Sequence, residues 1–263
     1  TAEDEILPSL LVMTRKSPQG DEKKGRAKFR LTACGNFALP QDTDNLAENY
    51  ADTLRFEVAN SLLRLCAVHG FSSALCDVSE AFTQSKRTLN GDSRRRVLRP
   101  PSGLRNLWCD ILRESGYSED DVNKFGFLVT NSIYGERDAP KIWSETFSAW
   151  ITDCEREAAE RMEEKVRVVK AMGFTELQTD SRVYVKRSAE GVTIVLVYVD
   201  DVVCTASTPE LVVSFMSDLR SRFRCTDIEW IRRGNEFFAD VATGPTFLTD
   251  QFSFEPSDGK AAG

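Results

Sequence analysis

The sequence predicts an α+β protein built on a split βαβ pattern, in which helices pack on a small sheet. Three observations predict this class. Short runs of Val, Ile, Leu and Tyr have strand composition, apolar residues recur at helical spacing in several segments, and the elements follow the order strand, helix, hairpin, helix, strand. With 263 residues and 41% apolar content, the chain can bury a core in one large domain or two small ones.

The amino-terminal part predicts a two-stranded β-ribbon and a helix. The ribbon occupies residues 8–37, with alternating character in its second strand and a turn around residues 18–21. The helix has one apolar face and ends before Gly70. That face consists of Leu54, Val58, Leu62, Leu65 and Cys66. His69 precedes the stop signal and is expected to cap the helix, so we assign it no catalytic role.

The rest of the chain supplies the predicted sheet. A short buried strand ends at Asp77, and the polar residues 84–125 predict a long connection. A second helix is expected to begin near Asp138, a favourable N-cap two residues before Pro140. The later predicted elements are a charged continuation of that helix at 155–171, a strand at 182–187, a hairpin at 192–206, a helix from Thr208, a last strand at 236–241 and a weakly ordered tail at 246–263.

Composition narrows the chemistry that the chain can perform. Its seven cysteines form no Cys-x-x-Cys pair and it has one histidine, so a zinc site is not expected. The scattered thiols are typical of a protein in a reducing compartment. Oxygen atoms are the ligands that remain, and they favour Mg²⁺ or Mn²⁺.

The charge pattern bears on location and on partners. No stretch approaches the roughly 20 apolar residues of a membrane span, and the amino terminus is acidic where a signal peptide would be basic, so we expect a soluble intracellular protein. The net charge of −7 argues against phosphate-rich partners, although residues 15–30 and 86–105 are locally basic. Within the second stretch, Arg94, Arg95 and Arg96 predict either a nucleic-acid contact or a solvated loop.

Residues 198–201 carry the strongest functional signal. They read Tyr-Val-Asp-Asp between two apolar runs, which predicts a β-hairpin with two carboxylates at its tip. Two such charges about 4 Å apart repel by roughly 4 kcal/mol at an effective dielectric near 20, so something must compensate them. A solvated turn is the alternative, since aspartate is common in turns. If Asp77 joins Asp200 and Asp201, the three carboxylates can hold the two cations of an in-line phosphoryl transfer.

Four segments carry a resemblance to a known family. They read Lys28-Phe-Arg-Leu-Thr-Ala-Cys-Gly35, Asp77-Val-Ser-Glu-Ala-Phe82, Ser132-Ile-Tyr-Gly-Glu-Arg-Asp-Ala-Pro-Lys-Ile-Trp143 and Tyr198-Val-Asp-Asp201. In sequence, order and rough spacing they resemble the motifs of the reverse transcriptase of Ty1/copia-type retrotransposons. The likeness covers about residues 8–226. Four motifs in the right order are far more specific than a single Asp-Asp pair.

The resemblance implies a fold, an activity and partners. The fold would be a reverse-transcriptase-like palm of the split βαβ, ferredoxin-like kind at 76–245, with a fingers-like ribbon and helix at 1–75. The activity would be RNA-directed DNA polymerisation with a nucleic-acid template-primer and deoxynucleoside triphosphates (dNTPs) as substrates. RNase H and integrase modules of a parent polyprotein would be partners that this sequence does not show. The protein would work in the cytoplasm, in a virus-like particle, or in the nucleus.

The resemblance also implies roles for individual residues. Asp77, Asp200 and Asp201, with the Val78 carbonyl, would hold two Mg²⁺ or Mn²⁺ ions. Further residues would contact the incoming nucleotide or the nucleic acid. The nucleotide contacts would be Lys28, Arg30, Phe82, Tyr134, Gly135 and Arg137, and the nucleic-acid contacts would be Arg94, Arg95, Arg96 and Tyr198. Arg30 is preferred over Lys28 for the triphosphate, because a guanidinium forks onto phosphate oxygens. Phe82 would exclude a 2′-hydroxyl, and the alternative for this ring is a place in the core.

Several departures from the family keep other functions open. Glu136, Arg137 and Asp138 replace the usual Leu-Lys-Gln and add two acids near the expected triphosphate site. The stretch after Asp227 lacks the family's Phe-Leu-Gly-Ile element. A non-catalytic relic that keeps the fold, with or without nucleic-acid binding, is therefore the main alternative. A small-molecule-binding domain of the same topology is a third, because a fold does not determine a function.

Overall fold

The computed structural model describes residues 4–15, 25, 27–38, 51–86, 95–152 and 172–231, and the statements below concern these residues. The chain folds into two compact units. The described residues of the first unit are 4–15, 25, 27–38, 51–52, 79–86, 95–152 and 172–173. Those of the second unit are 53–78 and 174–231.

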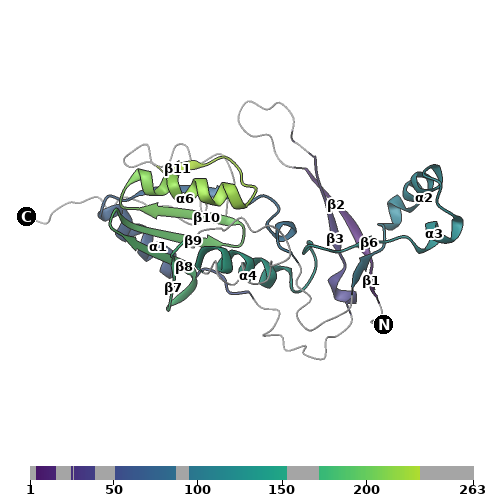
Figure 1. Ribbon diagram of the computed structural model, residues 1–263, viewed down its shortest axis with the longest axis horizontal. Coiled ribbons are helices and arrows are strands. Elements are labelled where there is room, and N and C mark those ends of the chain that lie inside the picture. The colour runs from purple at the N-terminus through teal and green to yellow at the C-terminus, as the bar shows by residue number, and fades with distance from the viewer. Residues whose placement is uncertain are drawn as a thin grey trace, which may run out of the picture. The chain divides into compact units, whose positions relative to one another are not determined.

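The first unit contains two small sheets (Figure 1). Strands β2 (Ser9–Arg15) and β3 (Ala27–Ala33) pair antiparallel as a ribbon, in a register that runs from Ser9 opposite Ala33 to Arg15 opposite Ala27. Strand β5 (Arg96–Leu98) lies between β1 (Glu5–Leu7), its parallel neighbour, and β6 (Phe127–Leu128), its antiparallel neighbour. Leu7, Ala33 and Leu98 are buried together, so the ribbon and the second sheet share a small core.

Helix α4 (Ala139–Thr152) buries one aromatic face in the first unit. Phe147 is fully buried and lies edge-on to Trp143 and Trp150, with ring centroids 5.7 and 5.5 Å apart. Their spacing of three and four residues places all three rings on one side of the helix. The short helix η3 (Ala81–Gln84) packs against α4.

The expected long connection at 84–125 is corrected by the structure. Its described part contains β5, the short helix η4 (Ser102–Leu104), α2 (Arg105–Glu114) and α3 (Glu119–Lys124). A capping box between Ser118 and Asp121 begins α3. Trp108 stacks on Phe125 and lies edge-on to Phe127, so the helices pack through a few aromatic rings. The polar composition concealed them because most of their side chains are exposed.

The second unit is a six-stranded antiparallel sheet with helices packed on it (Figure 1). The strand order is β11-β4-β10-β9-β8-β7. The strands are β4 (Ser72–Asp77), β7 (Thr175–Leu177), β8 (Asp180–Ser188), β9 (Gly191–Tyr198), β10 (Asp201–Ala206) and β11 (Glu229–Ile231). Leu75, Leu196 and Val203 form a core with residues of α1 (Phe56–Val68). Helix α6 (Pro209–Arg222) packs on β4, β9 and β10.

Most predicted elements of the second unit are confirmed. Helix α1 ends where the glycine signal places its end, with His69 as the C-cap residue and Gly70 at φ +81°. Thr208 is the N-cap of α6. Strand β11 was not predicted, whereas the predicted elements at 155–171 and 236–241, the tail at 246–263 and the turn at 18–21 lie outside the described residues.

The two units divide the chain differently from the expected boundary at residue 75. Helix α1 and strand β4 belong with the hairpin sheet, whereas described residues 79–86 and 95–152 belong with the ribbon. Helix α1 joins the sheet because its apolar face is buried there. No helix in the described ranges has both the length and the apolar run needed to cross a bilayer.

Replacing Phe147 by alanine should lower the free energy of unfolding by about 3–5 kcal/mol, since a fully buried aromatic side chain leaves a cavity. Urea unfolding followed by far-UV circular dichroism measures this change. The matched control is Phe37→Ala, because the Phe37 side chain is 64% exposed and should lose less than about 1 kcal/mol. Equal losses in the two variants would contradict the packing of α4.

Candidate active site

The Asp-Asp motif lies at the tip of the β9–β10 hairpin. Tyr198 ends β9, Asp201 begins β10, and these two residues face each other, so Val199 and Asp200 form a two-residue turn. Val199 has φ +54°, in the left-handed region that β-branched residues rarely adopt. Such a conformation costs on the order of 1–3 kcal/mol and is common at functional sites. The hairpin tip is therefore a strained turn that carries two carboxylates.

Strand pairing brings Asp77 to the same end of the sheet. Asp77 is the last residue of β4, and its cross-strand partner on β10 is Asp201. One residue later, the Val78 amide donates a 2.7 Å hydrogen bond to the Asp200 carbonyl. Directly opposed residues of an antiparallel pair have Cβ atoms about 5 Å apart and point to the same face. The three acidic residues therefore lie at adjacent strand ends within the second unit.

Asp201 carries a buried carboxyl group. It is 6% exposed, and its Oδ1 atom has no hydrogen-bond partner within the described part of the chain. Burial raises its pKa to about 7, and the nearby charges of Asp200, Asp77 and Glu229 add to this effect. A buried carboxyl in this state either holds a proton or requires a cation. The local charge imbalance is therefore the kind that a divalent ion relieves.

The donor set fits a hard divalent cation, although the group is not preassembled. Among the described residues, no three His, Cys, Asp or Glu side chains are arranged as a ready metal-binding group. The available donors at the hairpin tip are carboxylate oxygens, which Mg²⁺ and Mn²⁺ prefer. The unpartnered Oδ1 of Asp201 is free to become a ligand.

Residues beyond the predicted motifs support Asp77. The Thr226 amide donates to the Asp77 carbonyl at 2.9 Å, and the Asp77 amide donates to Thr226 Oγ1 at 3.1 Å. Glu229 on β11 adds a further negative charge near Asp201. Local sequence held no signal for Thr226, since its contact with Asp77 crosses 149 positions of chain. It held none for Glu229 either, since this residue lies in the stretch after Asp227 that departs from the family pattern.

The first unit gathers three of the predicted nucleotide-binding residues. Phe82 and Tyr134 lie edge-on with ring centroids 5.2 Å apart, and the Arg30 guanidinium carbon lies 5.4 Å from the Tyr134 ring centroid. The Arg30 Nε atom is buried and has no hydrogen-bond partner among the described residues. Of the two basic candidates on β3, the one that stacks on the tyrosine is Arg30. Lys28 lies two residues away, opposite Thr14.

Gly135 allows the tyrosine turn to lie against the end of the ribbon. It adopts φ +89°, and a Cβ atom there would collide with the Ala33 carbonyl oxygen. The Tyr134 carbonyl accepts a 2.7 Å hydrogen bond from the Ala33 amide, and the Gly135 carbonyl accepts one of 3.2 Å from Gly35. A glycine is therefore required both by the backbone conformation and by the close approach to β3.

The predicted nucleic-acid role of Arg96 is corrected by the structure. Its side chain is 6% exposed and pairs with Glu5, Glu136 and Asp138, so it cannot reach a phosphate backbone without breaking these contacts. Arg95 is exposed and pairs with Asp4 at 2.9 Å. Arg137 is also exposed, whereas Tyr198 packs against the core of the second unit. Arg94 lies outside the described residues.

Comparison with known proteins indicates a retroelement origin. No protein-family profile matches the chain. The chain is a distant relative of a retrotransposon Pol polyprotein. That relative is the Retrovirus-related Pol polyprotein from transposon RE1 of Arabidopsis thaliana, with 22% identity over 214 residues. The alignment covers 81% of this chain and 12% of the polyprotein, so the chain spans only a small part of its relative's length.

The raised pKa of Asp201 predicts a pH-dependent stability that asparagine abolishes. Between about pH 4 and pH 7 the folded protein keeps a proton that the unfolded chain has lost, so the free energy of unfolding falls as pH rises through this window. The free energy of unfolding of Asp201→Asn should therefore rise relative to that of the wild type as pH approaches 7, by at most about 1.4 kcal/mol per pH unit.

Urea unfolding in a chelating buffer at several pH values measures this difference. The matched control is Asp218→Asn, because Asp218 is an exposed residue of α6. Its difference from wild type should stay constant across the window. A constant difference for Asp201→Asn as well would contradict the electrostatic environment assigned to Asp201.

Proposed function

We propose that the chain is the reverse transcriptase segment of a copia-type retroelement Pol polyprotein, an RNA-directed DNA polymerase. The single observation that carries the proposal is the cross-strand pairing of Asp77 with Asp201 beside the Val199-Asp200 turn. It joins two motifs that lie more than 120 residues apart in the chain. The distant relationship to a Pol polyprotein supports the same assignment.

The topology of the second unit supports a palm. The four strands of the pattern are β4, β9, β10 and β11 in chain order, and β11-β4-β10-β9 is their order in the sheet, with β11 at its edge. A split βαβ fold places its last strand beside its first and its third beside its second in the same way. The β2–β3 ribbon, with Arg30 on its second strand, is a candidate for the fingers.

The proposed chemistry assigns the acidic residues to metal binding. Asp77 and Asp200 would be the main ligands of two Mg²⁺ or Mn²⁺ ions, Asp201 a weaker ligand, and the Val78 carbonyl an additional oxygen. When bound, these ions supply activation of the primer 3′-hydroxyl and charge stabilisation on the leaving oxygen. The hydroxyl attacks the α-phosphate of a dNTP, and pyrophosphate leaves.

In the first unit, the residues around Tyr134 would bind the nucleotide. The Arg30 guanidinium carbon lies 5.4 Å from the Tyr134 ring centroid, and a guanidinium is well suited to bind phosphate oxygens. Phe82 would lie under the sugar and exclude a 2′-hydroxyl. Lys28 and Arg137 would add positive charge near the triphosphate, and Gly135 would allow close backbone approach.

A non-catalytic relic is the second candidate, and one observation favours it. The stretch after Asp227 does not carry the family's Phe-Leu-Gly-Ile element, which helps to grip the primer. A relic would keep the fold and nucleic-acid binding without nucleotide addition.

Replacing Asp200 by asparagine should reduce primer extension on an RNA template by at least about a thousandfold, since a carboxylate ligand of the metal ions is lost. Gel-resolved extension with Mg²⁺ and with Mn²⁺ measures this effect, and Asp218→Asn is the control of equal charge change. Extension that persists in Asp200→Asn would rule out the assigned chemistry. No extension by the wild type, with RNA binding retained, would favour the relic.

Replacing Phe82 by alanine should relax the choice of sugar. We expect the ratio of kcat/KM for a dNTP to that for the matching ribonucleotide to fall by at least about tenfold, which corresponds to a change of 1.4 kcal/mol in discrimination. Single-nucleotide extension with each substrate measures the ratio. A loss of stability with unchanged discrimination would show that Phe82 is a core aromatic.

A further inference from the structure

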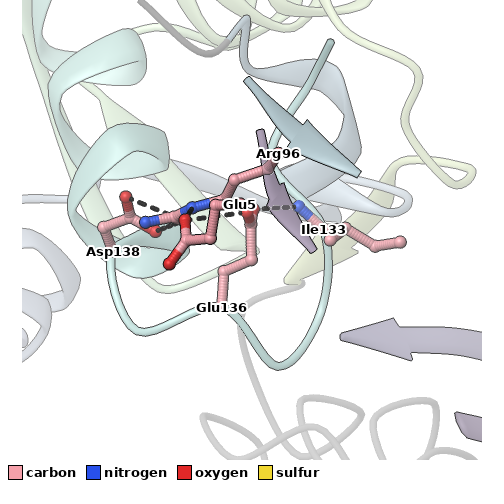
Figure 2. A network of polar contacts seen from close by, with 5 residues as sticks. All are labelled: Glu5, Arg96, Ile133, Glu136 and Asp138. Atoms are coloured by element: carbon pink, nitrogen blue, oxygen red, sulfur yellow. Dashed lines mark hydrogen bonds and ion pairs between the residues drawn. The ribbon is translucent and has the colours of Figure 1, made fainter. Parts of the chain in front are cut away.

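One buried guanidinium in the first unit binds three carboxylates. Figure 2 shows the side chains of Arg96, Glu5, Glu136 and Asp138 gathered together, with the Ile133 amide beside Glu136. The Arg96 Nε atom lies 2.7 Å from Glu5 Oε2, and its Nη1 atom lies 3.0 Å from both Glu136 Oε1 and Asp138 Oδ1. These contacts join positions that are 91, 40 and 42 residues apart in the chain.

Because these side chains are buried, each of them needs its partner in this network. The side chains of Arg96, Glu5 and Glu136 are 6%, 3% and 0% exposed, so water cannot replace a missing partner. Burial alone would lower the pKa of Arg96, but the carboxylates of Asp138, Glu136 and Glu5 more than offset it, and the pKa is raised. The guanidinium therefore stays charged, and its loss would leave carboxylates buried without their cation.

Glu136 connects Arg96 to the turn that carries Tyr134. Its Oε1 atom binds Arg96, which leaves Oε2 to accept a 2.9 Å hydrogen bond from the Ile133 amide. The Glu136 amide in turn donates to the Ile133 carbonyl at 3.3 Å. These two bonds close the turn from 133 to 136, which has Tyr134 and Gly135 at its centre.

The other side of the turn is attached to the ribbon. The carbonyls of Tyr134 and Gly135 accept hydrogen bonds from Ala33 and Gly35. With both sides held, the Tyr134 ring can maintain its contacts with Arg30 and Phe82. A turn with only one side attached would keep the strand contacts and lose the ring orientation.

We propose that Arg96 is a positioning residue for nucleotide binding: by clamping Glu136 and Asp138 to Glu5, it fixes the turn that sets Tyr134 against Arg30 and Phe82. The inference rests on the proposed function, in which these three residues contact the nucleotide. It also accounts for the two acids that replace the family's usual residues after Gly135. Both acids bind Arg96, which offsets part of their negative charge.

Two variants weaken the contacts between Arg96 and its carboxylates and still keep the charge or the volume of the replaced side chain. Arg96→Lys keeps the charge but replaces the fork with one ammonium, which cannot match three carboxylates in the same geometry. Glu136→Gln keeps the volume but replaces one oxygen with a donor, so one side chain can no longer accept from both Arg96 and Ile133. The matched control is Arg113→Lys, because Arg113 is an exposed arginine of the first unit that pairs with Asp110 and Glu119.

The first measurement separates nucleotide affinity from turnover. On folded protein, well below the unfolding midpoint, we expect Arg96→Lys and Glu136→Gln to raise the KM for dNTP by at least about tenfold while kcat per active site changes by less than about threefold. Arg113→Lys should leave both constants within about twofold of wild type. A lower active fraction with an unchanged KM would overturn the proposal and show that Arg96 only stabilises the fold.

The second measurement does not depend on activity. Hydrogen exchange followed by mass spectrometry should show at least about tenfold faster exchange of the amides at 133–136 in Arg96→Lys and Glu136→Gln, with unchanged exchange in β9 and β10. Unchanged exchange at 133–136 would overturn the positioning role whatever the kinetics. If exchange at 133–136 is faster in both variants but the wild type extends no primer, the proposed function is wrong. The role of Arg96 in holding the turn is then still supported.

Discussion

The antiparallel pairing of β4 with β10 is the constraint on which the candidate site depends. It sets Asp77 opposite Asp201, where two like charges repel and one of them is buried. The strands tolerate this repulsion because every residue of β10 is buried and β4 is buried through its centre. The sheet therefore holds carboxylates together that would separate in a flexible chain. Either a proton on Asp201 or a bound cation would relieve this repulsion.

The strained backbone of Val199 lies beside these acidic residues, at the tip of the same hairpin. Val199 adopts a backbone conformation that glycine would adopt more easily, yet the hairpin retains a β-branched residue there. The cost is met by the buried strands on both sides of the turn. The second unit therefore holds a strained turn and two opposed acidic residues at the same end of its sheet.

In the first unit, Arg96 offsets part of the negative charge of three carboxylates. The sequence places Glu136 and Asp138 beside the turn expected to approach a triphosphate, and this looked unfavourable for an anionic substrate. The tertiary structure pairs both acids, together with Glu5, with one guanidinium. The exposed Arg95, one residue earlier, makes a single surface pair. Two neighbouring arginines of the same basic cluster therefore have unlike roles, decided by the direction in which each side chain leaves the chain near β5.

The sequence by itself determined the elements whose signal is local. Helical spacing and Gly70 defined α1, alternation defined β3, and two apolar runs around Asp200 defined the hairpin, because each pattern repeats within a few residues. Only the tertiary structure decided the register of Asp77 on Asp201, the support from Thr226, the helices within 84–125 and the burial of Arg96. These features depend on contacts between positions about 40 to 150 residues apart, or on a few aromatic contacts in a polar segment. Local composition cannot encode such contacts, since either partner alone reads as an ordinary surface residue.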